Sequence, residues 1–139
     1  MRQACGGSIG PARSKMIVQH QPPLHLTYCL NIHPGETWEE NLAAIREHAC
    51  RVKELVSPAE PFGLGLRLSR RAANSLAEPS RLRELCQTLS GSGMYAFTVN
   101  GFHYGAFHGK AVKDDVYRPD WRDRERLDYT CRQDLAEAA

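Results

Sequence analysis

Hydrophobic positions along the chain form three short apolar runs, each followed by a longer stretch with a different spacing. The runs cover residues 24–30, 62–68 and 94–99, a length typical of buried strands. After each run, apolar side chains recur every three or four residues, as they do on one face of a helix. Strands that alternate with helices in this way predict βαβ units and a parallel sheet.

The first helix has clear sequence boundaries. Thr37 and Glu40 have the spacing of a capping box, in which each side chain accepts a hydrogen bond from the backbone N–H of the other residue. Apolar positions then recur from Trp38 to Val56, and Pro58 ends the pattern. We therefore expect a helix over residues 38–56.

The second run alternates two glycines, Gly63 and Gly65, with leucines. One face of this strand is apolar and the other lacks side chains, so a neighbouring group must pack closely there. Ser69 is expected to cap the next helix, whose start at Arg70 and Arg71 should be solvated. A proline at residue 79 should divide that helix in two.

The third run leads into a loop over residues 100–121, which is longer than most connections in compact domains and therefore suggests function. A last helix is expected from about residue 122, with Leu127, Cys131 and Leu135 on its apolar side.

Three parallel strands leave two unpaired edges, whereas parallel sheets are normally extended or closed by further strands. We therefore expect an α/β fold that is part of a (β/α)8 TIM barrel, with about three βα units. Residues 22–139 would be the N-terminal part of the barrel domain. Residues 1–21 would be a flexible basic arm, since no acidic residue precedes Glu36, or extra sequence upstream of a true start near Met16. The open sheet edges also predict self-association.

Composition favours a globular protein and argues against a nucleic-acid-binding or membrane-spanning one. The chain has 139 residues, 42% of them hydrophobic, which suits one globular domain. The net charge of +2 without a clustered basic face argues against nucleic-acid binding. No apolar run approaches the roughly 18 residues of a membrane span. Five cysteines without a CxxC pair indicate reduced thiols and a cytoplasmic protein.

Polar side chains follow the end of each predicted strand. In a barrel these ends meet at the face that carries the active site, so the side chains should converge. We predict contacts to a polar small-molecule metabolite from six of them: Asn31, His33, Arg67, Asn100, His108 and Lys113.

Structural roles are the alternative for three of these residues. Lys113 could pair with Asp114 or Asp115 instead of an anionic ligand. A His-Pro-Gly turn accounts for His33 without a ligand, and Arg67 could form an ion pair with Glu36 or Asp114, because a guanidinium in an apolar strand needs an anionic partner. No metal site is predicted within the chain. His103 and His108 supply two ligands, whereas zinc requires three or four.

Three stretches resemble the EboE family of metabolite-traffic proteins, which are xylose-isomerase-like TIM barrels. They are LTYCLNIHPGETWEENL, PFGLGLRLS and YAFTVNGFHYGAFHGKAVKDDVYRPDW, at residues 26–42, 61–69 and 95–121. The chain departs from the family pattern at His103, where a proline is usual. The resemblance implies a barrel similar to sugar phosphate isomerases and epimerases, associated with secondary-metabolite traffic or processing.

The resemblance also implies a metabolite that bears a sugar or a phosphate. A divalent metal, where the full-length protein uses one, would be held largely by later strands that this chain lacks. We expect the chain alone to be inactive. A non-catalytic carrier or scaffold, or an inactive truncated gene product, are the alternatives.

Overall fold

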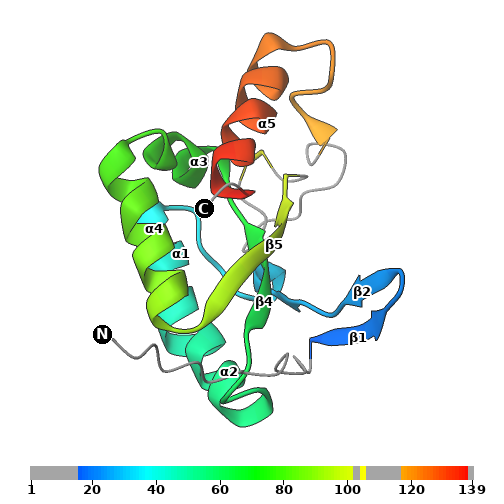
Figure 1. Ribbon diagram of the computed structural model, residues 1–139. Coiled ribbons are helices and arrows are strands. Elements are labelled where there is room, and N and C mark those ends of the chain that lie inside the picture. The colour runs from blue at the N-terminus through cyan, green and yellow to red at the C-terminus, as the bar shows by residue number, and fades with distance from the viewer. Residues whose placement is uncertain (1–15, 102–103, 106–116, 138–139) are drawn as a thin grey trace, which may run out of the picture.

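The computed structural model describes residues 16–101, 104–105 and 117–137, with the backbone alone for residues 134–137 (Figure 1). Its centre is a three-stranded parallel sheet of β3 (Tyr28–Cys29), β4 (Phe62–Arg67) and β5 (Met94–Asn100), in that order. The predicted α/β class and the parallel strands are therefore confirmed. The described residues do not form a closed barrel, which stays a prediction.

The predicted first strand, residues 24–30, is divided between two strands, and only residues 28–29 of it belong to the parallel sheet. The chain instead forms β2 (Pro23–His25), then β3, then a 3-10 turn, η1 (Leu30–Ile32). The strand β2 pairs antiparallel with β1 (Ile17–His20) in a separate two-stranded sheet. A continuous apolar run gives no sign of where a chain bends, and tertiary packing decides it.

The predicted boundary between arm and domain, at residues 21 and 22, falls in the turn of this hairpin. Ahead of the hairpin, Met16 is buried in the hydrophobic core, and its carbonyl accepts a hydrogen bond from the Leu26 N–H. The structured part of the chain thus includes residues 16–21. Residues 1–15 of the predicted arm lie outside the described residues.

The helices follow their local sequence signals. α1 (Trp38–Ala44) begins at the predicted capping box and continues through a π-helical segment, η2 (Ile45–Ala49), into α2 (Cys50–Val56). Ser69 caps α3 (Arg70–Leu76), and Pro79 starts α4 (Pro79–Gly91), as predicted. The last helix is α5 (Arg124–Glu137). None of the described helices is long and apolar enough to cross a membrane.

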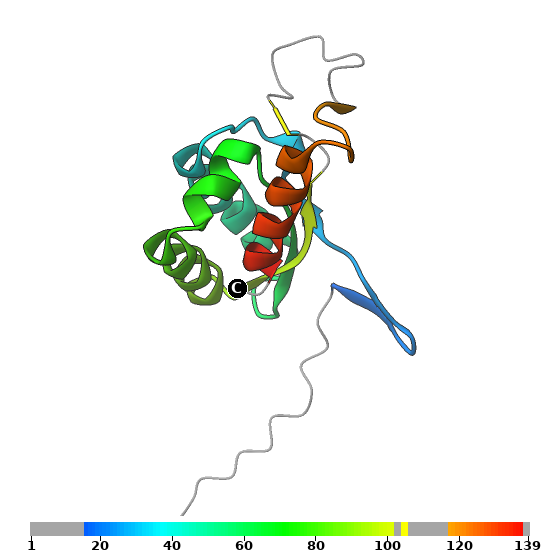
Figure 2. The same ribbon diagram turned by 90° about the horizontal axis from the view of Figure 1, so that it is seen from above.

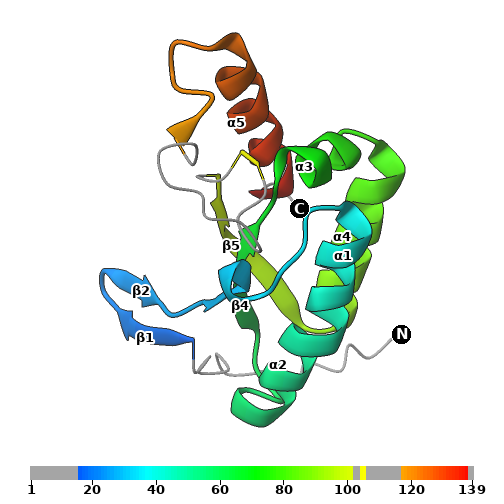
Figure 3. The ribbon, with the colours of Figure 1, turned by 180° about the vertical axis from the view of Figure 1, so that it is seen from behind.

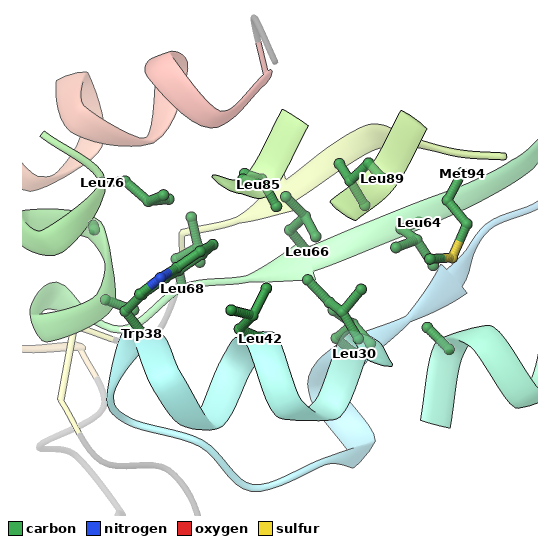
Figure 4. Packing of buried hydrophobic residues seen from close by; sticks show 14 of the residues in the cluster. Leu30, Trp38, Leu42, Leu64, Leu66, Leu68, Leu76, Leu85, Leu89 and Met94 are labelled. Atoms are coloured by element: carbon green, nitrogen blue, oxygen red, sulfur yellow. The ribbon is translucent and has the colours of Figure 1, made fainter. Parts of the chain in front are cut away.

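Figure 2 shows the helices on one face of the three-stranded sheet, while the β1–β2 hairpin projects away from them. On the helical face, Leu64 and Leu66 of β4 pack between Leu42 of α1 and Leu85 and Leu89 of α4 (Figure 4). Full burial of one such side chain contributes about 2 kcal/mol. This layer fixes β4, and thereby the position of its carboxyl end.

The glycines of β4 lie on the other face, and close packing against them is confirmed. A Cβ atom at Gly63 would lie 3.0 Å from the Tyr95 hydroxyl, and one at Gly65 would lie 3.1 Å from the Thr98 hydroxyl. Side chains from β5 therefore cover the strand where it has none of its own.

The predicted apolar side of the last helix is wrong. Leu127 and Cys131 are exposed, whereas Arg126, Tyr129 and Gln133 are buried. The reason is that α5 packs over the ends of β4 and β5, where backbone carbonyls need hydrogen-bond donors. Tyr129 and Gln133 both donate to the Leu68 carbonyl, and Arg126 Nη1 donates to the Gly101 carbonyl at 3.2 Å.

Candidate functional site

The carboxyl ends of β4 and β5 lie side by side, because Arg67 and Asn100 are paired in register. Two of the six predicted binding residues thus lie together at the carboxyl ends of neighbouring strands. A third, Asn31, lies in the 3-10 turn that follows β3 and is partly buried. Figure 3 shows this end of the sheet beneath α3 and α5.

His33 contacts the π-helical segment η2 and the strand β3. Its ring stacks on His48 of η2, with centroids 4.2 Å apart and planes 7° apart, and its Nε2 atom hydrogen-bonds to the Tyr28 hydroxyl at 2.7 Å. This packing accounts for His33 structurally. A binding role for it stays a prediction.

Arg67 forms the ion pair that the sequence offered as an alternative. It is 2% exposed, its Nη2 donates to Glu36 Oε1 at 2.7 Å, and its Nη1 donates to the Gly35 carbonyl at 2.7 Å. Ser69 Oγ donates to the Glu36 carbonyl at 2.5 Å. These bonds fix the turn at residues 35–36 against the end of β4.

A pocket of about 290 Å³ opens beside this turn, beyond the carboxyl end of β4. It is lined by Glu36, Ser69, Arg70, Arg71, Tyr104 and Gly105. Its lining brings together two guanidinium groups, one carboxylate, two hydroxyl groups and backbone. Such a mixture suits a small polar ligand, because it offers donors and acceptors within one concave surface.

The two arginines differ in how their charge is compensated. Arg70 Nη1 donates to the Tyr104 hydroxyl at 2.8 Å and lies 3.9 Å from Glu125 Oε2. The Tyr104 hydroxyl in turn donates to Glu125 at 2.9 Å, and its hydrogen bond with Arg70 raises the pKa of that guanidinium. The guanidinium of Arg70 thus fixes the position of the Tyr104 hydroxyl.

Arg71 is exposed, and within the described part of the chain it has no carboxylate within salt-bridge distance. Its charge reaches Glu40, whose pKa is lowered mainly by the backbone N–H of Thr37 and also by this guanidinium, but no described ion pair fixes it, so it supplies positive charge at the mouth of the pocket. A guanidinium in this state can bind a carboxylate or phosphate through two parallel hydrogen bonds.

Sequence reasoning placed Arg70 and Arg71 at a solvated helix start and missed their position in a pocket. The available signal was two arginines and a capping serine directly after a buried strand. Tyr104 was also missed. His108 and Lys113 lie outside the described residues, as does His103. Among the described residues, no group of three or more His, Cys, Asp or Glu side chains could hold a metal ion.

The fold and this pocket define an α/β protein with a polar site at the ends of parallel strands. Comparison with known proteins identifies no relative: no family model, no curated protein and no solved structure matches the chain.

Proposed function

We propose that this chain is the N-terminal part of a xylose-isomerase-like barrel protein, related to the EboE type, that binds a small anionic metabolite. The observation that carries the proposal is the pocket beside Arg71, which opens where the parallel strand β4 ends. In α/β sheets, ligands bind outside the carboxyl ends of the strands. We propose that the protein acts in the cytoplasm, in the traffic or processing of a secondary metabolite.

The pocket lining favours a ligand that carries both an anionic group and hydroxyl groups. Arg71 can neutralise a phosphate or carboxylate, and Arg70 adds positive charge from the same helix start. Glu36, Ser69 and Tyr104 can exchange hydrogen bonds with hydroxyl groups. A phosphorylated sugar combines these features. Proton abstraction next to a carbonyl is the reaction we propose for the longer protein, with any divalent metal held by its later strands.

A non-catalytic carrier is the second candidate, and one observation favours it. The carboxylate of Glu36 lines the pocket, but its Oε1 atom already accepts a hydrogen bond from Arg67 at 2.7 Å. A group that fixes a turn in this way is less available as a general base. Ligand binding without turnover in a longer relative would support the carrier, and strict dependence on a divalent metal would support the enzyme.

The proposal is tested by NMR titration of the chain with ribose 5-phosphate, ribose and inorganic phosphate. We expect shifts in the backbone signals of residues 69–71 with the phosphorylated sugar at millimolar concentration. Arg71→Ala should weaken this binding about tenfold, since a charge-assisted hydrogen bond is lost. Arg83→Ala is the matched control, because Arg83 is an exposed arginine of α4 outside the pocket.

If Arg71→Ala and Arg83→Ala weaken binding of the phosphorylated sugar equally, the pocket is not its binding site. If none of the three ligands shifts these signals, the chain alone does not bind, and an inactive truncated product becomes the better account.

A further inference from the structure

A second polar pocket adjoins the one that is lined by Arg71. It has a volume of about 300 Å³ and lies between α3 and α5, which pack against each other (Figure 1). Arg70 and Tyr104 line both pockets, so the two meet at this pair of side chains. A ligand bound beside Arg71 can therefore extend past Arg70 and Tyr104 onto further polar side chains, among them Asn74 of α3 and Glu125, Asp128 and Arg132 of α5.

The wall that the two pockets share is held in place by the protein itself. The Tyr104 hydroxyl accepts a hydrogen bond from Arg70 and donates one to Glu125. The Tyr104 ring lies edge-on to the Tyr129 ring, with centroids 5.3 Å apart, and the Arg70 guanidinium lies 5.2 Å from its centroid. A wall fixed in this way loses little conformational freedom when a ligand binds, which favours affinity.

The charges in the two pockets differ. In the first pocket Arg70 and Arg71 face one carboxylate, Glu36, which is already paired with Arg67, so positive charge is in excess. In the second pocket two guanidinium groups, Arg70 and Arg132, are balanced by two carboxylates, Glu125 and Asp128. The first pocket therefore suits an anionic group, and the second suits a polar group without charge.

The second pocket also offers the hydrogen-bonding groups that hydroxyls need. Asn74 Oδ1 accepts from Arg132 Nη1 at 2.5 Å, and Asp128 Oδ1 accepts from Arg124 Nε at 3.0 Å. Among the described residues, neither Asn74 Nδ2 nor Asp128 Oδ2 makes a hydrogen bond. One donor and one acceptor in the same pocket match a pair of hydroxyl groups, since each hydroxyl both donates and accepts.

We propose that the second pocket binds an uncharged sugar ring, so that the ligand is a phosphorylated disaccharide whose phosphate lies at Arg71. This inference rests on the proposed function and narrows its ligand from a small anionic metabolite to a sugar phosphate with two rings. Asn74 and Asp128 bind hydroxyl groups of the second ring, and Tyr104 lies where the two rings join. Each pocket is at the lower end of the range of about 300–1,000 Å³ for small-molecule sites, which suits one ring in each.

NMR titration of the whole chain tests the proposal by comparing glucose 6-phosphate with two phosphorylated disaccharides, trehalose 6-phosphate and sucrose 6-phosphate. All three ligands should shift the backbone signals of residues 69–71. Only the disaccharides should also shift the signals of residues 128–132. At least one disaccharide should bind about tenfold more tightly than glucose 6-phosphate, because the second ring adds hydrogen bonds.

Two variants separate the second pocket from the first. Asn74→Ala and Asp128→Ala should each weaken binding of the disaccharide about fivefold and leave glucose 6-phosphate binding unchanged. Both positions are helical and alanine favours helix, so folding should be kept, which urea unfolding verifies. Glu54→Ala is the matched control, because it removes a carboxylate from an exposed position of α2 outside both pockets.

The outcomes distinguish this inference from the proposed function. If all three ligands shift residues 69–71 with equal affinity and residues 128–132 do not respond, the second pocket is not part of the site, and the proposed function stands. If no ligand shifts residues 69–71, the proposed function fails and this inference fails with it. Equal weakening of glucose 6-phosphate and disaccharide binding in the two variants would also overturn the assignment of the second ring to this pocket.

Discussion

At the residue scale, Arg67 shows both what sequence can predict and where it stops. A guanidinium in an apolar strand was expected to meet an anion, and it meets the carboxylate of Glu36. Its second partner, the Gly35 carbonyl, was not predicted. The kind of partner followed from the cost of burying a charge. The sequence could not show whether this partner belongs to the protein or to a ligand, because that depends on where the fold places the turn at residues 35–36.

Tyr129 is another buried polar residue at the strand ends, and its hydroxyl group should make the stability of the fold decrease at alkaline pH. Burial raises the pKa of Tyr129 to about 12 from an ordinary value near 10. Between these values the unfolded chain has released the phenolic proton and the folded chain has kept it. Folding therefore becomes less favourable as pH rises from about 10 to about 12, by on the order of 2 kcal/mol.

The measurement is urea unfolding from pH 8 to about pH 12 for the wild type and Tyr129→Phe. At pH 8 the variant should be less stable by about 1 kcal/mol, since it loses the hydrogen bond to the Leu68 carbonyl. Gln133 still donates to that carbonyl, so folding should survive. The difference between the two proteins should shrink or reverse towards pH 12. A constant difference would show that Tyr129 does not titrate in this range.

At the element scale, local signals were sufficient where the physics is local. The capping box at Thr37, the serine cap at Ser69 and the break at Pro79 each depend on a few neighbouring residues, and each was predicted. The buried side of α5 was not predicted, because it depends on backbone carbonyl groups at the ends of strands that are distant in the sequence. Donors at Arg126, Tyr129 and Gln133 satisfy those carbonyls, and the apolar side of the helix is left exposed.

Two glycines provide a matched test of how β4 packs against β5. Gly63→Ala should destabilise the fold by about 1–3 kcal/mol, since the added methyl group would lie 3.0 Å from the Tyr95 hydroxyl and 3.2 Å from the Leu26 carbonyl. Gly91→Ala adds the same methyl group at the end of α4, where no atom lies within 4 Å. It should be neutral or stabilise by up to about 1 kcal/mol.

Thermal and urea unfolding of both variants decide this prediction. Similar stability of Gly63→Ala and wild type would mean that β5 can move away from β4 at low cost. The absence of side chains on that face of β4 would then need another explanation.

At the scale of the whole molecule, the parallel sheet explains why part of the site was predictable. Arg67 and Asn100 meet because parallel strands end at one edge, which the strand–helix alternation had indicated. Pairing in register is a property of the sheet and needs no detail of the side chains. His33 is held instead by stacking on His48, which lies in a π-helical segment that the pattern of apolar positions does not reveal.

The molecule should also differ in local stability between its two sheets. All six residues of β4 are buried, whereas the hairpin of β1 and β2 is a sheet of two strands, a size that is marginally stable on its own. The hairpin is joined to β5 through His25, whose ring stacks on Phe97 at 4.5 Å and hydrogen-bonds to the Tyr95 hydroxyl at 2.9 Å. Backbone amides of the hairpin should therefore exchange with solvent at least about 100-fold faster than those of β4.

Hydrogen exchange followed by NMR measures this difference residue by residue. Phe97→Ala removes the stacked ring and should speed exchange in the hairpin while leaving β4 unchanged, because the Phe97 side chain is partly exposed and lies outside the buried cluster. Equal acceleration in β1 and β4 would instead show that the hairpin and the parallel sheet open as one cooperative unit. In that case the contact between His25 and β5 would be part of the global stability of the fold rather than a local attachment.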